Sequence, residues 1–133
     1  MRFLIGIVGL GTNPHSRCFE DVARALAAAL RELGHEVEYA NPEAKPGRLI
    51  LFGANNLMDD PQNPQIPADS IIFNSEQLAA IADPSFFMQN WVQYRNFVVW
   101  DYSQTNIKAL RKLGIQRAVH CPIGYHPSMS KIA

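Results

Sequence analysis

Three side chains of this chain have the type and the place in the sequence to act as a general base. His15 follows the first apolar run, close to an expected helix start, where the helix dipole favours the neutral imidazole that accepts a proton. Asp101 follows a later apolar run, and Glu76 stands in the first turn of another expected helix. Structural alternatives stay open for all three: a surface histidine, a brace for a turn, and an ordinary helix residue. We expect one of them to take a proton from an attacking hydroxyl group.

Amides, hydroxyls and aromatic rings gather in the segments that follow the apolar runs. Any one of these residues is better explained as a turn or cap residue. The set as a whole, however, matches the hydrogen-bonding surface of a sugar. The sequence therefore predicts a polar ligand cleft. Its expected substrate-binding residues are Thr12, Asn13, Asn55, Asn74, Gln77 and Tyr102.

Short runs of apolar, mostly β-branched residues are the expected strands that position these side chains. The first run is apolar throughout, which is typical of a strand covered on both faces in a parallel sheet. The expected strands are residues 3–10, 37–40, 48–52, 70–73, 97–100 and 117–121.

Helical spacing of apolar residues separates the strands. One expected helix lies between residues 16 and 33, and Gly34 stands where a left-handed residue ends a helix. Ser103 is the expected cap of another helix, which Gly114 ends. Two shorter helices are expected at residues 75–81 and 84–94. Because strands alternate with helices, we predict an α/β, Rossmann-like three-layer domain. Its mostly parallel sheet should have about six strands flanked by helices.

The candidate residues follow the carboxyl ends of the expected strands, where open parallel sheets bind their ligands. The loop at residues 53–69, which contains Asn55, is long for a compact domain, and such loops are often functional. The domain is expected to cover residues 1–127. Residues 128–133 are interpreted as a tail where a crossing to a second domain would begin.

Glycines after the first strand leave a dinucleotide-binding alternative open. Gly9 and Gly11 supply the first two glycines of the G-x-G-x-x-G fingerprint, but Pro14 occupies the third position. The acidic residue that the fingerprint expects at the end of the second strand is uncertain, because Glu38 lies inside that strand and Asn41 at its tip. An NAD(P)-type Rossmann domain is therefore the second hypothesis.

Composition argues against several other classes. The 133 residues carry 12 basic and 12 acidic side chains, a balance that gives no cationic footprint for nucleic acid. No apolar run approaches the roughly twenty residues that span a bilayer. Cys18 and Cys121 are far apart, which indicates reduced thiols and a cytoplasmic location. His35, His120 and His126 lack the spacing of metal ligands, so no metal site is expected.

The second half of the chain resembles the end of the N-terminal domain of GT-B-fold glycosyltransferases. In that family a strand tip and a helix precede a last strand, which runs into a proline-glycine crossing. The same order appears here as V-V-W-D-Y-S at residues 98–103, the helix to Gly114, and P-I-G-Y at residues 122–125. The string at residues 71–77 is also similar to bacterial members related to the group 1 transferases. The resemblance covers about residues 71–129 and is only generic before them.

The resemblance implies the acceptor-binding half of a glycosyltransferase that moves a sugar from a nucleotide-sugar donor to a hydroxyl acceptor. It implies that the glycine-rich turn after the first strand lines the cleft. Gly11 therefore joins Thr12 and Asn13 among the expected substrate-binding residues. The crossing motif adds Gly124 and Tyr125 as substrate-binding residues. No cofactor is implied, because the donor is held mainly by a second Rossmann-like domain.

This sequence departs from the family by ending where the donor-binding domain should start. Its expected partners are therefore a second Rossmann-like domain or chain and a glycan or other hydroxyl acceptor. The chain alone should be inactive. A third hypothesis is a noncatalytic module that docks on a partner transferase.

Overall fold

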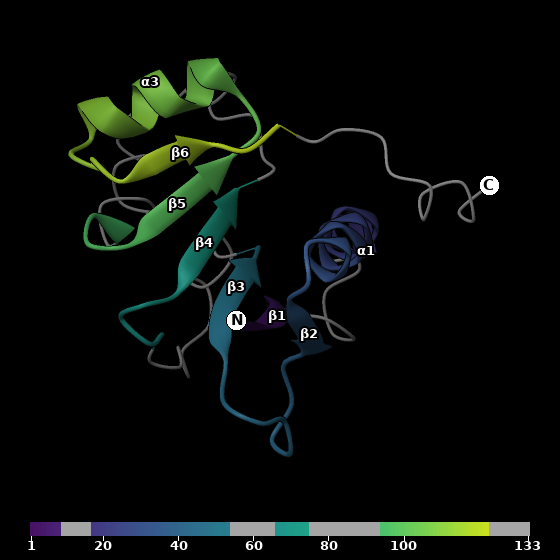
Figure 1. The fold of residues 1–133 in the computed structure, drawn as a ribbon. Coiled ribbons are helices and arrows are strands. Elements are labelled where there is room, and N and C mark those ends of the chain that lie inside the picture. The colour runs from purple at the N-terminus through teal and green to yellow at the C-terminus, as the bar shows by residue number, and fades with distance from the viewer. Residues whose placement is uncertain (9–16, 54–65, 75–93, 123–133) are drawn as a thin grey trace.

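The computed structural model describes residues 1–8, 17–53, 66–74 and 94–122. Its centre is a parallel sheet of six strands in the order β2-β1-β3-β4-β5-β6 (Figure 1). The strands are β1 (Arg2–Ile7), β2 (Glu36–Tyr39), β3 (Arg48–Phe52), β4 (Ile71–Asn74), β5 (Val98–Asp101) and β6 (Ala118–His120). Every pair of neighbours is parallel. The sheet, with the helices that flank it, confirms the predicted Rossmann-like α/β fold.

Helix α1 (Arg17–Glu32) covers one face of the sheet. Its buried stripe is Phe19, Ala23, Ala27 and Leu30, spaced by three or four residues as one face of a helix requires. The small alanines let the helix lie close to the β-branched and aromatic side chains of the strands. These strand residues include Phe3, Ile5, Ile50, Phe52, Ile71 and Phe73. The stacked rings of Phe52 and Phe73, with centroids 4.6 Å apart, join neighbouring strands within this core.

Helix α3 (Gln104–Lys112) packs on the opposite face, above β5 and β6. Its Ile107 and Leu110 are buried against Ile72, Val99 and Ala118. Alternation along the strands explains the two faces, because Val98 and Trp100 contact the α1 core while Val99 contacts the α3 core. The domain therefore has three layers.

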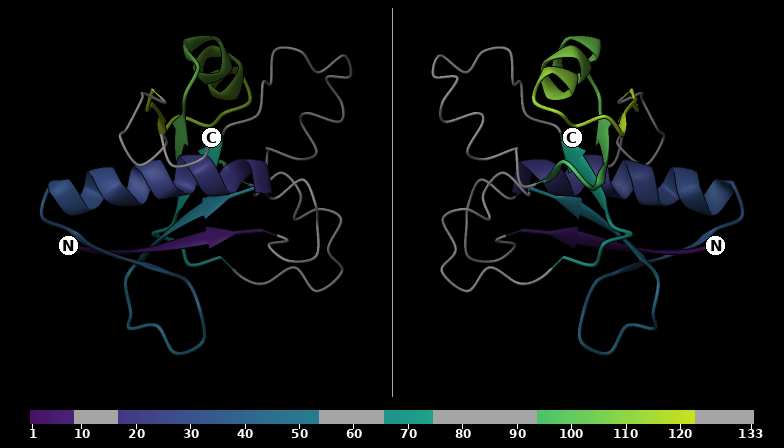
Figure 2. Two further views of the ribbon diagram at one scale, coloured as in Figure 1. Left: turned by 90° about the vertical axis from the view of Figure 1, so that its right-hand side faces the viewer. Right: turned by 90° about the vertical axis from the view of Figure 1, so that its left-hand side faces the viewer.

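The connection between β2 and β3 contains no helix. The chain must cross β1 to pass from β2 to β3, and right-handed crossing places this segment on the face opposite α1. Figure 2 shows the connection on that side of the sheet. A Cβ at Gly6 would lie 3.9 Å from Ala40, and a Cβ at Gly47 would lie 3.1 Å from the carbonyl oxygen of Arg2. The missing side chain at Gly47 thus lets the end of the connection lie close to the backbone of Arg2 at the start of β1.

Both helices end in the same motif, at the predicted residues. Gly34 and Gly114 have φ values of 93° and 92°, the left-handed conformation that glycine favours. The amide after each glycine donates five residues back, from His35 to Leu30 and from Ile115 to Leu110. These are Schellman motifs, which turn the chain from the helix into the next strand.

Some expectations fall outside the described residues. They are the two short helices at 75–81 and 84–94 and the tail at 128–133. Among the strands, β4 and β5 each extend one residue further than expected. Asn74 and Asp101 are therefore the last residues of their strands and not the first residues of loops. Within the described residues, no helix has the length and apolar character to span a membrane.

Candidate functional site

The carboxyl ends of all described strands lie at one edge of the sheet, because the sheet is parallel throughout. We call this edge the rim. At the rim, β3 ends at Phe52, β4 at Asn74, β5 at Asp101 and β6 at His120. The chain order reverses between β1 and β3, and such a switch point is where open parallel sheets bind ligands. The topology therefore directs the strand ends toward one shared surface.

A buried polar cluster closes the rim at β4 and β5. Asp101 and Asn106 are 0% exposed, and Asn74 is 2% exposed. Asn74 Nδ2 donates to Asp101 Oδ2 at 2.7 Å, and Asn106 Nδ2 donates to Asp101 Oδ1 at 3.1 Å. The amide of Ser103 donates to the same Oδ1 at 2.9 Å. One carboxylate thus ties together two strands and the start of α3.

Burial governs the acidity of this carboxylate. Desolvation raises the pKa of Asp101 above its ordinary value of 3.8. The hydrogen bonds from Asn74, Ser103 and Asn106, and lastly the electrostatic interaction with His120, act in the opposite direction and limit the rise in pKa. Both carboxylate oxygens face protein donors. This geometry suits a brace that positions the rim more than a base that meets a substrate.

The N-terminus of α3 is occupied by the chain's own acceptors. Ser103 is the N-cap residue, as the sequence predicts, and its Oγ accepts from the amide of Asn106 at 3.3 Å. Asp101 Oδ1 accepts from the amide of Ser103 itself. A helix N-terminus otherwise attracts phosphate and other anions. Here a buried carboxylate already stands at that position, so an incoming anion would meet negative charge.

His120 is fixed over the turn between β5 and α3. Its Nε2 lies 3.0 Å from the carbonyl oxygen of Tyr102, and its Nδ1 lies 3.0 Å from Nε2 of Gln104. A carbonyl oxygen can only accept, so Nε2 carries the proton, and Nδ1 then accepts from the Gln104 amide. The exposed imidazole thereby holds the end of β6 against the turn between β5 and α3.

The structure places three of the predicted site residues. It brings Asn74 and Asp101 into direct contact, and it uses the Tyr102 carbonyl to hold His120. The remaining candidates lie outside the described residues: His15, Glu76, Gly11, Thr12, Asn13, Asn55, Gln77, Gly124 and Tyr125.

Sequence reasoning missed two members of the rim. Asn106 stands inside a helix, where an asparagine usually faces solvent, yet it is 0% exposed. The sequence feature that could have identified it is its position three residues after the Ser103 cap. Asparagine is unfavourable inside helices, so an asparagine at this position indicates a specific hydrogen bond. From the sequence, His120 stands out only as a potential metal ligand. In the described part of the chain, no three potential ligand side chains group around a metal position.

Comparison with known proteins adds no relative: neither protein-family models, nor curated proteins, nor solved structures gave a match. Fold and rim therefore define the class on their own. The chain is a Rossmann-like α/β domain whose strand ends carry a buried carboxylate-amide cluster under a fixed imidazole.

Proposed function

We propose that this chain is the acceptor-binding half of a glycosyltransferase. The observation that carries the proposal is the single rim of the parallel sheet. It gathers Asn74, Asp101 and His120 from three successive strands, on the same edge of the sheet as the switch point between β1 and β3 where such sheets bind ligands. The resemblance of residues 71–129 to GT-B N-terminal domains supplies the reaction class. In this proposal the nucleotide-sugar donor is held by a second Rossmann-like domain or chain.

The chemistry of the rim supports a neutral ligand at β4 to β6. The start of α3 is filled by Asp101 and Ser103, so this part of the rim favours a hydroxyl-bearing group over a phosphate. The Gln104 amide is exposed beside the cluster, and its oxygen can accept hydrogen bonds from hydroxyls while its nitrogen bonds to His120. An acceptor glycan fits this description better than the diphosphate of a donor.

Sheet order weighs against the dinucleotide alternative. The classic dinucleotide-binding sheet has two further strands beyond its first strand. In the described part of this chain, β2 alone stands beyond β1. Pro14 at the third fingerprint position argues in the same direction.

Within the proposed site, the three candidate bases separate into two roles. His15 and Glu76 stay the candidates for proton abstraction. Asp101 acts as a positioning residue, because its carboxylate is 0% exposed and bonded to Asn74, Ser103 and Asn106.

Amide chemical shifts of the isotope-labelled chain test the binding part of this proposal. We expect simple alkyl glycosides to shift the amide signals of Tyr102, Ser103 and His120. Asp69 and Ser70, at the amino end of β4, serve as internal controls that should not move. Shifts produced by NADH in place of glycosides would support the dinucleotide hypothesis and overturn ours.

Turnover tests the catalytic part. The chain alone should release no sugar from nucleotide-sugar donors, whereas a longer protein that joins it to a following Rossmann-like domain should transfer sugar to a glycoside acceptor. Sugar transfer by the isolated chain would contradict the assignment as an acceptor half.

A further inference from the structure

The two edge strands of the described sheet expose apolar side chains. Tyr39 on β2 is 42% exposed, and Val119 on β6 is 49% exposed. An edge strand also presents backbone groups that can pair with a strand from another molecule. Both edges of this sheet are therefore places where two copies of the chain could join by strand addition.

Alternation of the backbone identifies which groups of β2 face outward. Glu36 and Ala40 donate their amides to Met1 and Ile5, so these residues face β1. Val37 and Tyr39 lie between them and therefore direct their carbonyls away from the sheet. These are the carbonyls to which an added strand would bond.

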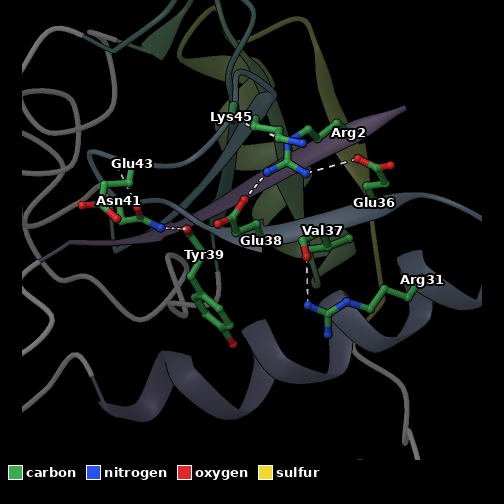
Figure 3. A network of polar contacts seen from close by, with 9 residues as sticks. All are labelled: Arg2, Arg31, Glu36, Val37, Glu38, Tyr39, Asn41, Glu43 and Lys45. Atoms are coloured by element: carbon green, nitrogen blue, oxygen red, sulfur yellow. Dashed lines mark hydrogen bonds and ion pairs between the residues drawn. The ribbon is translucent and has the colours of Figure 1, made fainter.

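Side chains of the same molecule occupy both outward carbonyls of β2, as Figure 3 shows. Arg31, in the last turn of α1, donates from Nη2 to the Val37 oxygen at 2.9 Å. Asn41 donates from Nδ2 to the Tyr39 oxygen at 3.0 Å.

The opposite edge has the same kind of cap at one of its outward carbonyls. Arg117 accepts from the amide of Val99, and Cys121 donates to Asp101, so these β6-side residues face β5. Ala118 lies next to Arg117 in the chain and therefore directs its carbonyl outward. Arg111, in the last turn of α3, donates from Nη2 to the Ala118 oxygen at 3.2 Å.

A shared local sequence produces both caps. The strings L-R-E-L-G at residues 30–34 and L-R-K-L-G at residues 110–114 place an arginine three residues before the helix-ending glycine. The left-handed glycine returns the chain beside its helix, so the guanidinium reaches the edge strand that follows. Two separate stretches of the chain thus cap an outward carbonyl of the following edge strand with the same kind of arginine.

We propose that Arg31 and Arg111 close the two edges of the sheet against strand addition by a second copy of this chain. Each guanidinium occupies an outward carbonyl and places a charge at the edge, the two features that discourage edge pairing. The proposal does not depend on the proposed function. It leaves the rim and the sheet faces as the surfaces through which a partner domain can approach.

The test replaces both arginines by methionine, which keeps the length of the side chain and a good helix propensity but removes the donors and the charge. The matched control is the pair Arg24→Met and Lys112→Met, which lie on the same two helices, are exposed, and change charge and apolar surface equally. Light scattering after size-exclusion chromatography, over a range of concentrations, reports the mass.

We expect the Arg31→Met/Arg111→Met protein to form dimers or larger species at concentrations where the wild type and the control do not. Adding Val119→Lys to this protein should reverse the part of the association that occurs at β6, because a lysine on an edge strand opposes pairing. An unchanged mass, or a control that associates equally, would overturn the proposal. Each single variant is measured as well, and circular dichroism confirms that it folds. The single variants therefore test the proposal even where the double variant does not fold.

Discussion

The α1–β2 and α3–β6 units end alike but hold their strand tips by different means. Each has a helix that stops at a left-handed glycine and an arginine that caps the following edge strand. Beyond β2, an exposed local turn follows, in which the Glu43 amide donates to Asn41 Oδ1 at 2.9 Å. At the tip of β5, which precedes α3, the buried carboxylate of Asp101 instead bonds to Asn74 at the tip of β4, 27 positions earlier in the chain.

This difference shows that the architecture itself does not require a buried carboxylate. The β2 end is held by local bonds between exposed groups, and the sheet there is complete. The burial of Asp101 costs desolvation free energy, which the exposed polar groups at the end of β2 avoid. The cluster is therefore best explained by its position on the rim, where it fixes Asn74 and the start of α3.

The largest effect should come from breaking the cluster itself. Asp101→Ala removes the acceptor of two buried amides and of the Ser103 N–H, and unsatisfied buried donors are costly. We expect the free energy of unfolding to fall by about 3 kcal/mol in urea denaturation. Asn41→Ala, at the tip of β2, is the matched control and should cost about 0.5 kcal/mol. Equal losses at the two tips would remove the contrast between the units.

The pH dependence of stability also distinguishes the buried Asp101 cluster from the exposed bonds at the end of β2. Because burial raises the pKa of Asp101, the folded state binds more protons than the unfolded state in the pH range between 3.8 and the folded-state pKa. The contribution of Asp101 is thus fully present below pH 3.8 and is lost as the pH rises through the folded-state pKa. As the pH rises through that range, the wild type should therefore lose unfolding free energy relative to the Asp101→Asn variant. A difference that rises with pH would mean that the hydrogen bonds outweigh desolvation.

Local patterns made the elements of both units predictable from the sequence. The strands, the Ser103 cap and the stops at Gly34 and Gly114 depend on neighbouring residues only. The Asn74–Asp101 contact depends on β4 and β5 being neighbours, and the sheet order is decided by packing between distant segments. The burial of Asn106 follows from that contact, so the sequence predicts the candidate site as a set of strand ends and not as a hydrogen-bonded cluster.

The two helix stops should respond alike to substitution. Gly34→Ala and Gly114→Ala each force a Cβ into a left-handed conformation, which costs about 1–2 kcal/mol. Space does not distinguish them, because the Cβ at Gly34 meets nothing within 4 Å and that at Gly114 comes no closer than 3.4 Å to Arg95. Asparagine, which tolerates this conformation, should restore part of the loss at both positions. Denaturation midpoints that differ widely between the two alanine variants would show that the stops are not equivalent.

The smallest effect should come from the amino ends of the same strands, where the units also differ. Arg2 on β1 pairs with Glu36 and Glu38 of β2, whereas the first residue of β5 is the apolar Val98. The side chains of Glu36 and Glu38 are 75% and 44% exposed and that of Arg2 is 21% exposed, so water reaches the carboxylates and weakens both pairs. Arg2→Met should therefore lower the free energy of unfolding by about 0.5 kcal/mol, and salt should reduce the difference. Arg24→Met provides the comparison for loss of charge alone. A larger loss that salt does not reduce would instead assign Arg2 a packing role against the β2–β3 connection, where its Nε donates to the carbonyl oxygen of Lys45 at 3.4 Å.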